Sequence, residues 1–356
     1  MNKRIESIDG WRAIAALGVL YTHVWATLSF PVLNIGGIDL LRFLNLWGNG
    51  VQLFFVISGF CFYLVLEKQQ QYNLRTALAF WKKRWLRIAP AFYTICVIVA
   101  LVHHSRSAGD ILYKLFFNFI FLHNHVKGAE VDAIFWSLAV EWHFYLLLPL
   151  IFIVINRAGI IQTISALIVL CFVLNILHYS GLFYPGDQWW YSIFNNIGHF
   201  AWGILTGYLF RKNILFGFLT RNYSLVWGLL FAYTGKTLFS SAMLARFPAY
   251  AVFLQSAGPL VMTFGFACMI YTSLMNELSF SVIGNKFFSW IGKISYSFYL
   301  LHAVVLGQVY LLVRPYLANS PLAVGVLMIT TLLVLLPVSY LSYTLLESFY
   351  FKRKQA

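Results

Sequence analysis

The chain has 356 residues, of which 61% are hydrophobic and only 10% are charged, and its formal net charge at pH 7 is +14. Soluble domains carry roughly a quarter charged residues, so this composition excludes a soluble globular protein. The basic residues lie in short patches between apolar runs. Such a distribution is typical of the cytoplasmic loops of membrane proteins and argues against nucleic-acid binding.

Apolar runs of about twenty residues, the length that crosses the hydrocarbon core of a bilayer, recur along the whole chain. They predict an all-α integral membrane protein, a bundle of about ten transmembrane helices that forms one multi-span domain over residues 1–356. The predicted spans are 8–30, 46–66, 88–104, 135–155, 159–178, 190–210, 223–240, 249–272, 290–312 and 322–345. Segment 110–122 is shorter and contains Lys114, so we expect it to be interfacial or re-entrant.

The distribution of Lys and Arg predicts the orientation in the membrane. With both termini in the cytoplasm, about sixteen of these residues fall on the inner side and about seven on the outer side. No small-residue cleavage site follows the first apolar stretch, so we expect a retained helix rather than a signal peptide. The four cysteines lie inside apolar runs without metal-ligand spacing, and we expect no metal site.

The first predicted span contains three ionisable residues, Asp9, Arg12 and His23. On a helix, Arg12 and His23 point the same way and are separated by a rise of about 16 Å, and Asp9 is spaced to pair with Arg12. One interpretation is an ordinary helix end with a hydrogen-bonded histidine. We favour a functional face, because ionisable side chains within a span are costly and usually functional.

A basic cluster, Lys82, Lys83, Arg84 and Arg87, directly precedes the third span. It fits an anchor at the inner membrane surface or a site for anionic lipid headgroups. It fits equally a clamp for the phosphates of a soluble cofactor, since the guanidinium group binds phosphate in a bidentate manner.

Two further stretches lie inside spans. In FFVISGFCFYLVLEK, Ser58 and Gly59 either allow close helix packing or line a substrate site. In FWSLAVEWHFYLLLP, Glu141 lies within a span, with Trp136 before it and Tyr145 one turn later on the same face. A carboxylate there needs a partner, and the arginine and histidine of the first span are candidates; the other interpretation is a wetted carboxylate in an interfacial aromatic belt.

Weaker signals come late in the chain. IGKISYSFYLLH places Lys293, Tyr296 and His302 on one span, and Glu347 precedes a basic tail. We interpret both as structural rather than catalytic.

Together these stretches resemble the acyltransferase family 3 membrane proteins, which O-acylate bacterial surface sugars. The Arg12-x10-His23 spacing is similar to the signature of that family's first helix, and FFVISGF to its second-helix motif. RWLRIAP resembles its Arg-x-x-Arg element, and WSLAVEWHFYLLLP its Trp-Ser-Leu…Glu…Phe-Tyr stretch. ISYSFYLLH and Glu347 also fit, so the resemblance covers nearly the whole chain. Some members carry a fused extracytoplasmic hydrolase-like domain; we expect the stand-alone form.

The resemblance implies an acyl-CoA donor, usually acetyl-CoA, used from the cytoplasm of a bacterium. It also implies a sugar or lipid-linked glycan acceptor at the outer side of the inner membrane. Whether the transferred group is acetyl, succinyl or a longer acyl group, and which glycan accepts it, both stay open.

The chemistry of acyl transfer suggests a role for each candidate residue. His23 is the expected general base, because the reference pKa of histidine lies near neutrality; a transient acyl-histidine is the open alternative. Glu141 would orient His23 or stabilise its protonated form. Arg12, fixed by Asp9, would stabilise negative charge or hold the thiol arm of the donor. The phosphates and the adenine end of CoA would be held by Lys82, Lys83, Arg84 and Arg87. The substrate site would be lined by Ser58, Gly59, Trp136 and Tyr145.

The competing class is a multi-span transporter or flippase of an envelope glycan or small solute, which would also use intramembrane charges. The chain shows no two halves with matching interrupted helices. Dependence on acyl-CoA separates the two classes. A scaffold or sensor without chemistry ranks last, because it leaves the aligned Arg12 and His23 unexplained.

Overall fold

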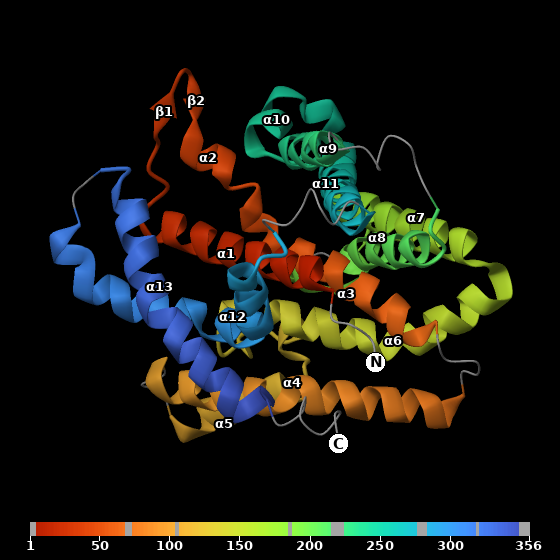
Figure 1. The fold of residues 1–356 in the computed structure, drawn as a ribbon, viewed down its shortest axis with the longest axis horizontal. Coiled ribbons are helices and arrows are strands. Elements are labelled where there is room, and N and C mark those ends of the chain that lie inside the picture. Colours follow the sequence, from red (N-terminus) through yellow and green to blue (C-terminus); the bar gives the residue numbers. More distant parts are fainter. Residues whose placement is uncertain are drawn as a thin grey trace. The chain divides into compact units, whose positions relative to one another are not determined.

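The computed structural model describes residues 5–67, 73–103, 107–183, 187–214, 224–275, 283–317 and 320–348. Within these ranges the chain is almost entirely helical (Figure 1). The long helices are α1 (Glu6–Thr27), α3 (Gly50–Leu66), α4 (Leu74–His103), α6 (Trp136–Ala158), α7 (Ile160–Tyr179), α8 (Ile193–Arg211), α9 (Ser224–Leu238), α11 (Ala251–Met275), α12 (Lys286–Val313) and α13 (Ala323–Ser342). The short elements are α2 (Leu40–Leu44), α5 (Ala108–Phe119), α10 (Ser241–Arg246) and an antiparallel hairpin of β1 (Asn34–Ile35) and β2 (Ile38–Asp39).

Each of the ten predicted spans overlaps one of the long helices, which supports an all-α multi-pass membrane protein. Among the described residues, seven segments are long and apolar enough to cross a bilayer. They are Leu40–Val65, Leu74–Val102, Ala133–Ala158, Ile160–Tyr179, Pro248–Met275, Lys286–Tyr316 and Ala323–Glu347. Helices α1, α8 and α9 lie outside this set, so the count of ten stays a prediction.

Two segments differ from the expected boundaries. Helix α4 begins at Leu74, well before the predicted start at 88, so the basic cluster lies within a continuous helix. Segment 110–122 contains most of α5, in which Lys114 and Asn118 are buried while Leu112 and Phe116 are exposed. Its polar side chains face the protein, and its placement at the interface or as a re-entrant segment stays a prediction.

The chain divides into two compact units, each assembled from three separate parts of the sequence. Unit 1 comprises Met1–Trp11, Gln52–Trp81 and Ser137–Asn285, and unit 2 comprises Arg12–Val51, Lys82–Trp136 and Lys286–Ala356. Four of the five boundaries fall inside helices, and neither unit corresponds to a continuous stretch of sequence. The single multi-span domain over 1–356 stays a prediction.

Unit 1 is held together by close helix packing at glycines. A Cβ atom on Gly59 of α3 would lie 2.2 Å from the carbonyl oxygen of Phe200 on α8, and one on Gly203 of α8 would lie 2.0 Å from that of Val56. The rings of Phe144 and Phe200 stack beside them with centroids 3.9 Å apart. Small residues permit such backbone contact within a bilayer, where helix association depends on packing. The packing interpretation of Gly59 therefore agrees with the structure.

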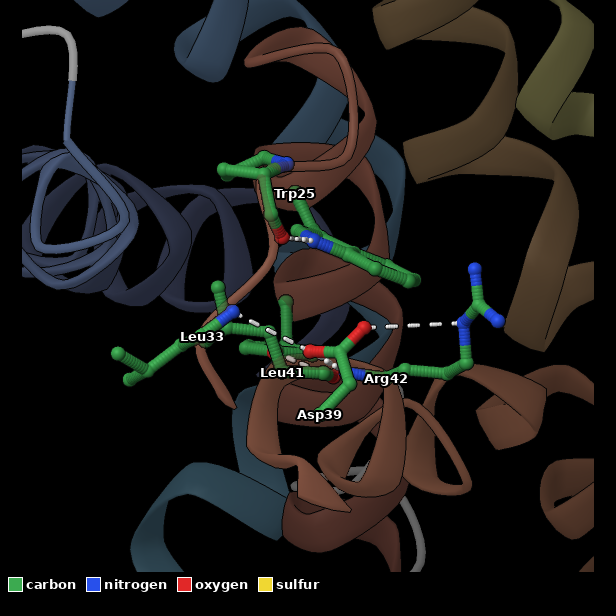
Figure 2. A network of polar contacts seen from close by, with 7 residues as sticks. Trp25, Leu33, Asp39, Leu41 and Arg42 are labelled. Carbon is green, nitrogen blue, oxygen red and sulfur yellow. Dashed lines mark hydrogen bonds and ion pairs between the residues drawn. The ribbon is translucent and has the colours of Figure 1, made fainter. Parts of the chain in front are cut away.

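In unit 2, a polar network fixes the chain between α1 and α2 (Figure 2). The Asp39 carboxylate accepts hydrogen bonds from the backbone N–H groups of Leu33 (3.3 Å) and Arg42 (3.4 Å) and forms an ion pair with the Arg42 side chain at 3.7 Å. The Trp25 indole donates to the Pro31 carbonyl at 2.8 Å. Asp39 thereby caps α2, and the Trp25 bond ties the segment after α1 to that helix.

Candidate active site

Five of the twelve predicted site residues fall into three clusters, one in unit 1 and two in unit 2. The Glu141 cluster consists of Ser58 on α3 and of Glu141 and Tyr145 on α6. The Ser58 hydroxyl donates to Glu141 Oε1 at 3.0 Å, and the Tyr145 hydroxyl donates to the same oxygen. The expected shared face of Glu141 and Tyr145 is confirmed. Glu141 thus has two hydroxyl partners inside its own unit.

Neighbouring aromatic side chains hold Tyr145 in place. Its ring is buried and packs edge-on against Phe62 with centroids 4.8 Å apart. Its backbone carbonyl accepts a hydrogen bond of 2.9 Å from the Trp81 indole. A fixed Tyr145 gives the Glu141 carboxylate a fixed orientation, which is the property that a catalytic or substrate-orienting carboxylate needs.

In unit 2, His23 of α1 lies against His302 of α12. Their ring centroids are 5.0 Å apart, with planes tilted by 57°. His302 is fully buried, and its Nδ1 lies 2.5 Å from the Tyr299 carbonyl oxygen. The Tyr299 hydroxyl donates in turn to the Ile134 carbonyl at 2.8 Å. His23 is half-buried, so it remains the more accessible ring of the pair.

Asp132 is a carboxylate near this histidine pair that the sequence analysis did not select. It interacts electrostatically with His23. Its Oδ1 accepts from the Ile134 N–H at 3.1 Å and so caps the short helical turn Ala133–Phe135 that leads into α6. The signal available in the sequence was an acidic residue directly before the aromatic stretch that contains Glu141.

A second cluster of unit 2 joins α4 to the end of α13. Arg87 Nη1 lies 3.4 Å from Glu347 Oε2, and the Ser297 hydroxyl donates to Glu347 Oε1 at 2.6 Å. Glu347 is almost completely buried and ends the π-helical turn Tyr343–Glu347. Its structural interpretation therefore agrees with the geometry. Of the other basic residues, Lys82 and Lys83 are exposed, and Arg84 is half-buried.

The structure does not test every expected pairing. Asp9 is buried and belongs to unit 1, whereas Arg12, three residues later on α1, begins a segment of unit 2. Glu141 and His23 also belong to different units. Both pairings stay predictions. Trp136 begins α6, and its carbonyl accepts a hydrogen bond of 2.8 Å from the Asn124 side chain.

Two residues that the sequence analysis interpreted as structural, His302 and Glu347, contact residues that it selected, His23 and Arg87. The signal for both was an ionisable residue in an apolar helix. Among the described residues, no group of three or more His, Cys, Asp or Glu side chains is arranged to hold a metal ion.

Comparison with known proteins decides the family. The family described as an acyltransferase domain matches residues 5–340. The chain belongs to this acyltransferase family. The resemblance noted from its motifs is thereby confirmed.

Curated relatives of this acyltransferase are longer proteins. It is 30% identical over 164 residues to a peptidoglycan O-acetyltransferase, OatA, of Listeria monocytogenes, which covers 42% of this chain and 24% of that protein. It is 28% identical over 166 residues to the O-acetyltransferase OatA of Staphylococcus aureus, covering 41% and 24%. The chain thus spans about a quarter of the length of these relatives. No solved structure matches it significantly.

Proposed function

We propose that this chain is a membrane-embedded O-acyltransferase. It moves an acyl group, in the simplest case acetyl, from cytoplasmic acyl-CoA to a hydroxyl group of a cell-envelope sugar or lipid-linked glycan. The observation that carries the proposal is the match to the acyltransferase family over residues 5–340. The names of the relatives, O-acetyltransferase and peptidoglycan O-acetyltransferase, support acetyl as the group and an envelope glycan as the acceptor.

The proposed setting is the inner membrane of a bacterium, with ten membrane-spanning helices and both termini in the cytoplasm. In that arrangement α1, α8 and α9 cross the bilayer together with the seven more apolar segments. The distribution of Lys and Arg between the loops supports this orientation.

In the proposed reaction His23 is the general base. It takes the proton of the acceptor hydroxyl while the hydroxyl oxygen forms a bond to the thioester carbonyl carbon. The carbon–sulfur bond then breaks, and the CoA thiolate leaves with a proton returned from His23. Arg12 stabilises the negative charge on the carbonyl oxygen, and the buried Asp9 fixes Arg12. A transient acyl group on His23 remains the alternative chemistry.

We assign the basic cluster of α4 to the donor. Lys82 and Lys83 are exposed and can reach CoA phosphates, and Arg84 is half-buried. Arg87 is ion-paired with Glu347, so a phosphate has to share its guanidinium group with that carboxylate. We therefore assign the first contact with the donor to the lysines.

We assign the Glu141 cluster to the acceptor and to the orientation of the base. Ser58 and Tyr145 donate to Glu141 and so keep its carboxylate in a fixed place. Glu141 serves as the carboxylate that orients the base or binds the acceptor, with Trp136 as part of the lining. Gly59 contributes through the close approach of α3 and α8 rather than through a side chain.

The test uses membranes that contain the protein, labelled acetyl-CoA and an envelope polysaccharide fraction, with base-labile label as the product. Loss of a general base reduces the rate about 10²- to 10⁴-fold, so His23→Ala is expected to abolish detectable transfer while the protein still folds. His125→Ala, a change at an exposed histidine, is the matched control and retains activity.

Near-normal transfer by His23→Ala would overturn the assignment of the base. If the wild type transfers no label from acetyl-CoA or from longer acyl-CoA donors, the proposed activity fails. Acyl-CoA-independent movement of a glycan across the membrane would then favour the transporter class.

A further inference from the structure

The tautomer of His302 follows from its contact with Tyr299. The Tyr299 carbonyl oxygen can only accept a hydrogen bond, so the His302 nitrogen 2.5 Å from it, Nδ1, carries the proton. In the neutral ring, Nε2 is then unprotonated and can act only as an acceptor. The backbone of α12 therefore decides which nitrogen of His302 is free to accept.

This acceptor atom is buried without a hydrogen-bond partner among the residues that the structure describes. Buried acceptors in folded proteins nearly always have a donor, and one without a partner calls for an explanation. The ring of His23 lies beside it, with a centroid separation of 5.0 Å. Two imidazole rings joined end to end by an N–H···N bond of about 3 Å have centroids about 5 Å apart. At this separation, a hydrogen bond between the two rings needs only a reorientation of one ring.

We propose that His302 is the positioning residue of the base: its Nε2 accepts a hydrogen bond from a ring N–H of His23. The bond is not formed in the observed arrangement, in which His302 Nε2 has no partner among the described residues, so it requires a rotation of the His23 side chain. With one nitrogen of His23 donating to His302, the other nitrogen keeps its lone pair for the acceptor hydroxyl. The inference rests on the proposed function, since it assumes that His23 is the base.

The arrangement performs the task of the carboxylate in a Ser-His-Asp triad, which holds the catalytic imidazole in one tautomer and orientation. Here the order is Tyr299 carbonyl, His302 ring, His23 ring. His302 does not touch the substrate. Asp132, which interacts electrostatically with His23, contributes charge rather than tautomer control.

The first measurement is nitrogen NMR of the purified protein in detergent with ¹⁵N-labelled histidine, the His23 signals being assigned by their loss in His23→Gln. In the wild type, we expect one His23 nitrogen to have the ¹⁵N chemical shift of a protonated ring nitrogen and the other to have that of an unprotonated one. His302→Phe keeps a ring but no acceptor, so the His23 signals are expected to shift towards the average of two tautomers. His302→Gln keeps an acceptor and is expected to preserve the wild-type signals.

The second measurement is steady-state transfer. His302→Phe is expected to lower kcat about 100-fold with the KM for acyl-CoA unchanged, and His302→Gln to restore part of the loss. His199→Gln is the matched control, because His199 is a buried histidine that bonds Thr263 in unit 1, and it leaves the His23 signals and kcat unchanged.

Unaltered His23 signals in His302→Phe would overturn the inference, whatever the activity. If His302→Phe does not fold, the test rests on His302→Gln. His23 signals at the average of two tautomers in His302→Gln would then overturn the inference. A wild type without transferase activity would remove the proposed function, and the NMR comparison would still decide whether the two histidines are hydrogen-bonded.

Discussion

At the level of single residues, the ion pair of Arg87 and Glu347 is expected to contribute strongly to stability. The Glu347 side chain is fully buried, whereas that of Arg87 is 26% exposed. Breaking a fully buried pair costs about 3–5 kcal/mol, and the partial exposure of Arg87 places the cost of losing the Glu347 charge below that range but above that of an exposed pair. We expect Glu347→Gln to lower the thermal unfolding midpoint in detergent clearly. The matched control is Glu67→Gln, which breaks the more exposed pair with Arg211 at 3.0 Å; exposed pairs contribute at most about 1 kcal/mol. Equal midpoints for the two variants would contradict the argument.

His123 is expected to make stability depend on pH. It lies between α5 and α6, outside the predicted spans, and donates from Nε2 to the Phe135 carbonyl at 3.2 Å. Burial lowers its pKa to about 4. In the unfolded chain, His123 is protonated below about pH 6.5, whereas in the folded chain it is protonated only below about pH 4. The free energy of unfolding therefore decreases as the pH falls from about 6.5 to about 4.

The effect of His123 is measured from unfolding midpoints in detergent at pH 7 and pH 5. His123→Gln keeps a donor for Phe135 but does not titrate, so its midpoint is expected to fall less on acidification than that of the wild type. His125→Gln, at the exposed neighbouring histidine, is expected to retain most of the wild-type response. An identical acid response in His123→Gln and the wild type would show that other groups are responsible.

Single residues were predictable where they break a pattern. Arg12, His23 and Glu141 stand out because each is an ionisable group in an apolar helix. Their partners were not predictable in the same way. Contacts such as that of His23 with His302 join residues far apart in the chain, and packing between helices determines them rather than any local spacing.

At the level of helices, α3 and α8 depend on glycine at their contact. A Cβ atom on Gly59 would lie 2.2 Å from a backbone oxygen, which cannot move without shifting α8. We expect Gly59→Ala to destabilise the protein by about 1–3 kcal/mol, as overpacking does. Gly307→Ala is the control, because nothing lies within 4 Å of its added Cβ. That change is expected to be neutral or to stabilise by up to about 1 kcal/mol, and the comparison is of unfolding midpoints.

The helices themselves were largely predictable, and their ends were not. Apolar runs locate the ten long helices of the described residues, because a long apolar segment in lipid has to satisfy its backbone groups internally and so becomes a helix. The early start of α4 was missed, since Lys82 to Arg87 look like the end of a span although charged residues continue a helix readily. The hairpin was missed as well; Gly36 and Gly37, with φ of 58° and 83°, form its turn, and adjacent glycines between apolar residues are a hairpin signal.

At the level of the whole molecule, composition was sufficient to predict a membrane protein, but not its two units. Each unit combines three separate segments, and four of the five boundaries lie inside α1, α3, α4 and α6. No change in composition marks such a boundary.

The number of membrane crossings determines where the two termini lie. Seven crossings would place the termini on opposite sides of the membrane, and ten would place them on the same side. The weakest crossing is α9, whose 15 residues extend only about 23 Å, against a hydrocarbon core of about 30 Å.

Single cysteines at exposed positions between the predicted spans decide between these counts. Under ten crossings, Lys127→Cys and Arg246→Cys react with a membrane-impermeant maleimide added to intact cells, whereas Arg157→Cys and Lys212→Cys react only after permeabilisation. All four positions are exposed, and three of the four native cysteines are buried, so the background is low. The pair Lys212 and Arg246 flanks α9. If both positions react only after permeabilisation, α9 does not cross, the number of crossings becomes nine, and the C-terminus lies outside, away from the cytoplasmic donor.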